Sequence, residues 1–110
     1  MSNVLSAFET KRRDLQSKLE TLLGSSNVYF QPPESFKLRY PAIVYSTAIP
    51  DSKYANNRLY MYTNKFSLIY IRQTNTEDKM KEIAQAFPLI KQDRTYVADN
   101  LYHTVYDLYY

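Results

Sequence analysis

Residues 93–110 decide the fold, and they read Asp93-Arg-Thr-Tyr-Val-Ala-Asp-Asn-Leu-Tyr-His-Thr-Val-Tyr-Asp-Leu-Tyr-Tyr110. From Tyr96 onward the positions alternate between two sets rich in aromatic and β-branched side chains, and no glycine or proline interrupts the run. A period of two with this composition is typical of a β-strand. Because strands usually have about five or six residues, we predict one C-terminal strand over 94–110 with a bulge or bend near Asp99–Asn100.

The alternation divides this predicted strand into two faces. One face would carry Tyr96, Ala98, Asn100, Tyr102, Thr104, Tyr106, Leu108 and Tyr110, and the other Val97, Asp99, Leu101, His103, Val105, Asp107 and Tyr109. The chain has 12 tyrosines, a residue type that is enriched at interfaces because it joins a large ring to a polar tip. We therefore expect many tyrosines at subunit contacts or in water, on a sheet face or edge that the helices leave uncovered.

The N-terminal segment over 3–23 has the apolar spacing of an amphipathic helix. Its apolar stripe consists of Val4, Phe8, Leu15, Leu19 and Leu22. Ser6 and Glu9 have the spacing of a capping box, which predicts that the regular helix begins near Ala7. The only glycine, Gly24, stands where a left-handed cap would end the helix.

A second helix is predicted over 76–87. Met80, Ile83, Ala84 and Phe87 form its apolar face, and Pro88 is expected to end it. The segment Thr74-Asn-Thr76 offers several N-cap side chains. Glu77 and Asp78 would place negative charge in the first turn, where the helix dipole favours it.

The region between the helices predicts strands. A short strand is expected at Val28–Phe30, and the strands of region 42–73 at Ala42–Ile49, Leu59–Thr63 and Lys65–Gln73. A polar connection over 50–60 separates the first two of these. Its length indicates a projecting loop, with a plain wide hairpin as the alternative. The order helix, strands, helix, strand predicts an α+β domain, in which two helices cover one face of a mainly antiparallel sheet of about four strands.

Composition limits the class of protein. With 110 residues, the chain is expected to form one domain over 1–110 with a modest core. No cysteine is present, which excludes disulfides and thiolate chemistry. The N-terminal residues do not have the pattern of a signal peptide, and no apolar run is long enough to span a bilayer. We expect a soluble, non-exported protein that does not contact membranes.

Catalysis is not predicted. His103 is the only histidine, and a strand would place it about 13 Å from both Asp99 and Asp107, too far for a hydrogen-bonded triad. The single glycine of the chain excludes the usual phosphate-cradling loops. We therefore expect no enzyme, no cofactor, no metal and no catalytic residue, with His103 held by structural contacts.

Nucleic-acid binding is an alternative hypothesis. Tyrosines on an exposed sheet beside Lys65, Arg72 and Arg94 could stack on the bases of a single strand. The formal charge of +3 is ordinary for a protein of this size and does not decide the matter. The segment Lys65-Phe-Ser-Leu-Ile-Tyr-Ile71 lacks the glycine of the usual aromatic RNA-binding motif.

Three segments of the chain carry a resemblance to a known family. They are Arg39-Tyr-Pro-Ala-Ile-Val-Tyr45, Tyr54-Ala-Asn-Asn-Arg-Leu-Tyr60, and a C-terminal pattern with Arg94, Tyr96, Ala98-Asp-Asn-Leu101, His103, Val105 and Leu108-Tyr109. These segments resemble the small neck proteins of long-tailed bacteriophages, which are variously labelled tail terminator, tail completion or minor capsid proteins. With their spacing, they cover about two thirds of the chain. The predicted order of elements is similar to that of the tail terminator fold.

The resemblance implies a structural protein of the virion neck, assembled in the host cytoplasm. A tail terminator would form a ring, expected to be hexameric, that caps the tail tube. It would dock the head connector or head-closure protein, and DNA would pass through its lumen without sequence recognition. A head-closure or tail-completion adaptor of the same neck remains an alternative. Head-closure proteins are generally small β-barrels, so helices on an open sheet would favour a terminator.

Interface candidates follow from the same resemblance. They are the loop over 50–60 and the C-terminal strand, with Tyr54, Asn56, Asn57, Arg58, Tyr102, Tyr106, Tyr109 and Tyr110. An exposed strand edge is a ready template for another chain, so subunits could join by sheet pairing. For each tyrosine the alternative is that it fills the core of a small domain.

Overall fold

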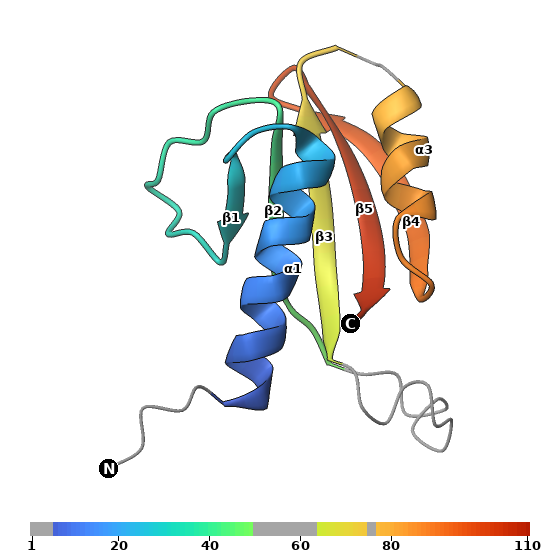
Figure 1. The fold of residues 1–110 in the computed structure, drawn as a ribbon. Coiled ribbons are helices and arrows are strands. Elements are labelled where there is room, and N and C mark those ends of the chain that lie inside the picture. Colours follow the sequence, from blue (N-terminus) through green and yellow to red (C-terminus); the bar gives the residue numbers. More distant parts are fainter. Residues whose placement is uncertain (1–5, 50–63, 75–76) are drawn as a thin grey trace.

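The computed structural model describes residues 6–49, 64–74 and 77–110. In chain order the elements are α1 (Ala7–Leu23), β1 (Val28–Phe30), β2 (Ala42–Thr47), β3 (Lys65–Arg72), α3 (Asp78–Gln85), β4 (Ile90–Ala98) and β5 (Leu101–Tyr109). The strands form one sheet in the order β1-β2-β3-β5-β4, and both helices lie on the same face of it (Figure 1). The predicted α+β class is confirmed.

The sheet is mixed and has five strands, rather than the expected four or so. Strand β1 runs parallel to β2. The other neighbouring pairs, β2 with β3, β3 with β5 and β5 with β4, are antiparallel. We call the face that α1 and α3 cover the helix face, and the opposite one the open face.

Both ends of α1 are encoded locally, as predicted. The side chain of Ser6 accepts a hydrogen bond from the backbone N–H of Glu9 at 3.1 Å. Gly24 has a φ of 81°, and its N–H donates to the carbonyl of Glu20 at 2.8 Å. A residue without a Cβ adopts this left-handed conformation at little cost.

Helix α3 is shorter than predicted and begins differently. It spans Asp78–Gln85 instead of 76–87, and its N-cap is Glu77, which makes no side-chain capping bond. The N-cap of α3 is therefore not one of the residues 74–76 that were predicted for it. Asn75 and Thr76 themselves lie outside the described residues, as do the predicted strand at 59–63 and the loop at 50–60.

The prediction of one C-terminal strand over 94–110 is wrong. The chain reverses at Asp99 and Asn100, whose φ values of 53° and 62° are those of a tight hairpin turn. Strand β4 begins at Ile90, before the predicted start, and carries a register shift between Gln92 and Arg94. The expected irregularity at 99–100 is thus a full turn. The bulge lies earlier in the chain, between Gln92 and Arg94.

The turn also changes the predicted faces. Tyr96 lies opposite His103 and therefore shares the face of His103. The prediction of one continuous strand placed Tyr96 on the other face, with Tyr102 and Tyr106. Within β5 the predicted alternation holds, because Thr104, Tyr106 and Leu108 are buried beneath the helices. Figure 1 shows β4 and β5 as the two arms of this hairpin, with α3 in front of them.

The core lies between the helices and the helix face. Its members include Leu15, Leu19, Ile43, Tyr45, Phe66, Leu68, Ile83, Tyr106 and Leu108. Tyr45 is completely buried, and its hydroxyl donates to the side-chain oxygen of Gln16 at 2.6 Å. A tyrosine in this position satisfies its polar tip with a partner from α1.

The expected tyrosine-rich uncovered face is not observed. By strand register, Tyr45, Tyr70, Tyr102 and Tyr106 lie on the helix face. Among the described strand residues, the tyrosines of the open face are Tyr29, Tyr96 and Tyr109. Most of these rings therefore stabilise the subunit itself.

Candidate functional site

The predicted site residues do not gather in one place. Tyr54, Asn56, Asn57 and Arg58 lie outside the described residues. The remaining four belong to β5 or directly follow it, where the alternation of the strand separates them. Tyr102 and Tyr106 belong to the helix face, and Tyr109 belongs to the open face. Tyr110 follows the strand and packs against the core.

Tyr106 is a core residue, so we remove it from the interface candidates. It is completely buried, and its hydroxyl donates to the carbonyl of Met80 in α3 at 3.1 Å. Burial raises the pKa of Tyr106 to about 12, because an ionised phenol would lose its hydration there. Its position explains how β5 and α3 are held together.

Tyr110 joins the end of the chain to α1. Its hydroxyl donates to the carboxylate of Asp14, and the ammonium of Lys18 lies 4.8 Å from its ring centroid. Phe87 meets the same ring edge-on at 5.8 Å between centroids. The hydrogen bond from Tyr110 lowers the pKa of Asp14, while partial burial raises the pKa of Tyr110. Tyr110 is thus half-buried and already engaged within the subunit.

Tyr109 and Tyr102 remain accessible in part. Tyr109 lies opposite Lys65 on the open face, and the Lys65 ammonium is 5.9 Å from its ring centroid. Tyr102 lies near the turn of the hairpin, opposite Val97 on β4 and Arg72 on β3. Of the predicted tyrosines that the structure describes, these two are the better placed for a partner.

The open face has an apolar centre. Strand register aligns Val44 of β2, Ile69 of β3 and Val105 of β5 across the sheet. Beside this row, the rings of Tyr96 and His103 stack with centroids 4.7 Å apart and planes 9° from parallel. The open face therefore combines an aliphatic stripe with one aromatic pair.

The outer edge of β4 is the most exposed part of the sheet. Every residue from Lys91 to Val97 is exposed, and Val97 keeps 62 % of its surface. In an antiparallel sheet, about half of the backbone groups of an edge strand point away from the neighbouring strand. This edge can accept hydrogen bonds from another extended chain.

The opposite edge of the sheet is much less available. Strand β1 has 3 residues. The backbone N–H of Val28 donates to the carbonyl of Ser26 at 2.8 Å, and its carbonyl accepts from the side chain of Gln16 at 2.9 Å. Tyr29 contacts Phe36 edge-on at 5.2 Å between centroids, which places the segment after β1 beside this edge. The β4 edge was missed at the sequence level because β4 was not predicted as a separate strand.

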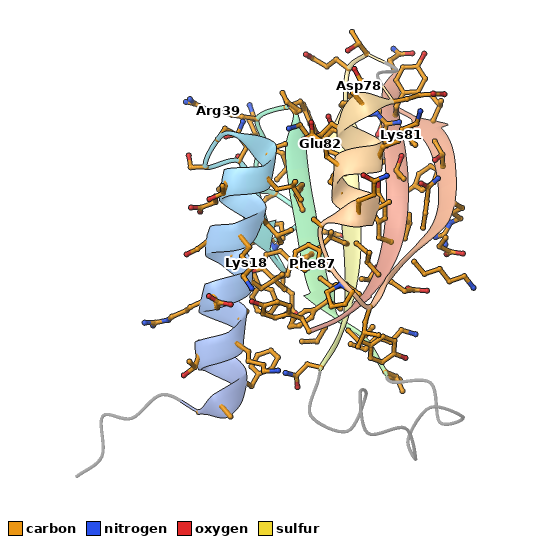
Figure 2. All side chains as sticks on the ribbon, turned by 45° about the vertical axis from the view of Figure 1, so that its right-hand side comes forward. Lys18, Arg39, Asp78, Lys81, Glu82 and Phe87 are labelled. Carbon is orange, nitrogen blue, oxygen red and sulfur yellow. The ribbon has the colours of Figure 1, made fainter. Side chains whose placement is uncertain are left out.

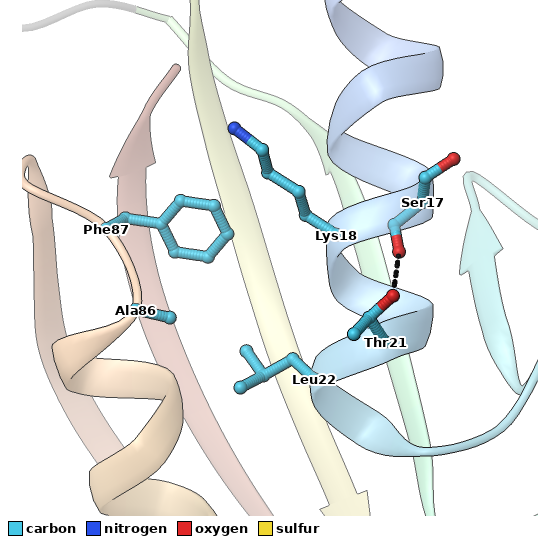
Figure 3. A pocket seen from close by; sticks show the side chains of 6 residues that line it. All are labelled: Ser17, Lys18, Thr21, Leu22, Ala86 and Phe87. Atoms are coloured by element: carbon cyan, nitrogen blue, oxygen red, sulfur yellow. Dashed lines mark hydrogen bonds between the residues drawn. The ribbon is translucent and has the colours of Figure 1, made fainter.

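A groove lies between the two helices. Its lining residues are Ser17, Lys18, Thr21 and Leu22 from α1, with Ala86 and Phe87 from the end of α3 (Figure 3). Its volume is about 350 Å³, and Lys18 and Phe87 reach toward each other across it (Figure 3). Lys79 crosses one end, donating to the carbonyl of Leu22 at 2.7 Å. The lining has an apolar floor and a single charged side chain.

His103 is held by contacts within the hairpin. His103 Nδ1 lies 3.0 Å from the carbonyl of Leu101, and its ring stacks on Tyr96, which are the structural contacts expected of it. Within 6–49, 64–74 and 77–110, no group of three or more histidine, aspartate or glutamate residues could hold a metal ion. None of the helices in these ranges has the length and apolar character needed to cross a membrane.

Comparison with known proteins gives no relative. Neither a protein-family description, nor a curated protein, nor a solved structure matches this chain.

Proposed function

We propose that this protein is a structural component of the neck of a long-tailed bacteriophage, a tail terminator that forms a ring on the end of the tail tube. The proposal rests on the three resembling segments and on one structural observation, the free outer edge of β4. It assigns a binding role and no turnover. The partners would be copies of the chain, the tail-tube protein, and the head connector or head-closure protein, with DNA passing through the lumen.

The architecture supports a terminator over a head-closure protein. Two helices packed on one face of an open sheet differ from the small β-barrels that head-closure proteins generally form. A tail-completion adaptor is still compatible with this architecture. Docking experiments on tube ends and on heads separate these neck roles.

The β4 edge supplies a surface for joining subunits. From Lys91 to Val97 this strand is exposed, so an extended segment could add to the sheet there without disturbing the core. The β1 edge is short and its Val28 groups are already bonded. A ring therefore needs a second, different surface, and the loop residues Tyr54, Asn56, Asn57 and Arg58 are our candidates for it.

Single-stranded nucleic-acid binding has less support. The stacking hypothesis needs tyrosines on an uncovered face, whereas Tyr45, Tyr70, Tyr102 and Tyr106 lie on the helix face. Arg72, one of its three cations, is 2 % exposed and donates to the hydroxyl of Thr104 at 2.7 Å. We keep this function as an outcome of the test below.

The test mixes the purified protein with tubes of the tail-tube protein from the same phage, and electron microscopy and sedimentation follow binding. We expect rings at tube ends and few along tube walls. A variant with Asn56, Asn57 and Arg58 changed to alanine should bind less, with Lys81→Ala on the outer surface of α3 as a matched control (Figure 2). A protein that ignores tube ends but binds single-stranded DNA would contradict the proposal.

A further inference from the structure

The two halves of the exposed β4 edge differ in how well they are protected. The first half carries Lys91, Asp93 and Arg94 and a register shift between Gln92 and Arg94. Charges and bulges are the usual devices that prevent an edge from pairing with another chain. The second half, Thr95–Ala98, has no charge and no proline. The part of the β4 edge that lacks such charges and bulges is therefore Thr95–Ala98.

The composition of that stretch favours strand pairing. Thr95, Tyr96 and Val97 are β-branched or aromatic, which are the residue types enriched in strands. Tyr96 is 38 % exposed and Val97 is 62 % exposed, although both belong to a regular strand. Covering these side chains would bury apolar surface in addition to satisfying backbone groups. A partner that lies along Thr95–Ala98 gains from both effects.

We propose that the isolated protein is a two-fold dimer, in which the β4 edges of two copies pair antiparallel around Tyr96. The second copy is the favoured occupant because the stretch is self-complementary. It presents no like charges to itself, and the shielded β1 edge offers no comparable partner strand among the described residues.

Symmetry limits the register of such a pair. A two-fold axis perpendicular to the sheet keeps both open faces on the same side, so each residue must lie opposite one whose side chain points to the same face. Two residues that lie opposite each other across the axis must therefore both have even numbers or both have odd numbers. Only a pair centred on Tyr96 uses Arg94–Ala98 while staying between the register shift and the turn at Asp99.

This register brings compatible side chains together. Tyr96 lies opposite Tyr96 of the partner subunit on the open face. Thr95 lies opposite Val97 of the partner subunit on the helix face, as a β-branched pair. Arg94 lies opposite Ala98 of the partner subunit, so no charge lies opposite a like charge within the paired stretch 94–98. Cross-strand pairs of this kind stabilise a sheet.

The inference concerns the free protein and does not depend on the proposed function. It also has a consequence for that function, since a dimer covers the same edge that we assign to ring assembly. The dimer would have to dissociate before a subunit joins a ring. Until then, pairing would hide an edge that could otherwise aggregate.

Light scattering over a range of concentrations, without tubes, gives the first test. We expect the mass of two chains for the natural protein and of one chain for Val97→Lys, which places a charge on the edge. Val97→Thr keeps the β-branch and should remain dimeric. Circular dichroism checks that each variant folds, as expected for a side chain that is 62 % exposed.

Cross-linking tests the register, because the chain contains no natural cysteine. Opposed Cβ atoms lie about 5 Å apart and diagonal ones about 7–8 Å, so oxidation should link Tyr96→Cys and leave Thr95→Cys unlinked. Glu82→Cys on α3 measures random collision. A monomer at all concentrations, a ring in the absence of tubes, or linkage at Thr95 rather than Tyr96 would overturn the proposal. Tube binding by the natural protein is scored separately, so either proposal can fail alone.

Discussion

Tyr96 and His103 stack face to face across β4 and β5, with ring centroids 4.7 Å apart and planes 9° from parallel. They are direct cross-strand neighbours near the turn of the hairpin. Aromatic pairs of this kind contribute about 0.5–1.5 kcal/mol beyond the area that they bury. The pair therefore helps to fix the register of the exposed strand β4.

We predict a coupling free energy of about 0.5–1 kcal/mol between these two rings. A double-mutant cycle with Tyr96→Ala and His103→Ala, read by denaturant unfolding, measures it. The cycle is best done in the Val97→Lys background, so that dimerisation does not contribute. Additive effects of the two substitutions would show that the stacked geometry contributes no stability.

The buried hydroxyl of Tyr106 should be visible in the alkaline stability of the protein. Its pKa is raised from 10.0 to about 12 by burial, so the folded state holds the phenolic proton more tightly than the unfolded state. The contribution is fully present below pH 10 and is lost as the pH rises from 10 toward 12. Urea unfolding at several pH values should show this decline. The loss of unfolding free energy per pH unit should be smaller in Tyr106→Phe.

At neutral pH, Tyr106→Phe should cost about 1 kcal/mol of unfolding free energy, because it removes one hydrogen bond while keeping the ring. Tyr102→Phe is a suitable control, since Tyr102 is only partly buried. An alkaline profile of Tyr106→Phe that coincides with that of the natural protein would exclude Tyr106 as the titrating group.

Gly24 should be sensitive to substitution for conformational reasons alone. Its φ is 81°, and a Cβ there would meet no atom within 4 Å. We expect Gly24→Ala to destabilise the protein by about 1 kcal/mol, and Gly24→Asn by less, since asparagine tolerates the left-handed region better. Thermal unfolding ranks the two variants. Equal effects would mean that φ is not the cause.

The core beneath α1 should respond strongly to truncation. Leu68 is fully buried in the middle of β3 and belongs to the core cluster. Leu68→Ala should cost about 2–5 kcal/mol through lost burial and the cavity left behind. Ile69→Ala on the open face is the matched control and should cost less. The reverse order would mean that the open face is the better-packed side of β3.

Local signals in the sequence predicted local structure well. Ser6 with Glu9, and Gly24, define the ends of α1 because their hydrogen bonds and dihedral angle involve only neighbouring residues. The hairpin was harder to predict. Asp99-Asn100 is less distinctive than the usual glycine-containing two-residue turn, so a run of alternating residues on both sides of it was interpreted as one strand.

The candidate site could be predicted only in part. Strand periodicity separates the faces of β5, but it does not say which face the helices cover. That depends on long-range contacts, such as the bonds from Tyr45 to Gln16 and from Tyr106 to Met80. The free edge of β4 depends on the strand order of the whole sheet, which the sequence pattern does not contain.

We would first measure the mass of the protein by light scattering, alone and then with the tail tubes that the proposed function assigns as its partner. The account predicts a two-chain species that is lost when tube ends are added and replaced by rings on those ends. Val97→Lys should be monomeric alone and bind tube ends poorly. A stable monomer that ignores tubes and binds single-stranded nucleic acid would contradict both the neck assignment and the role of the β4 edge.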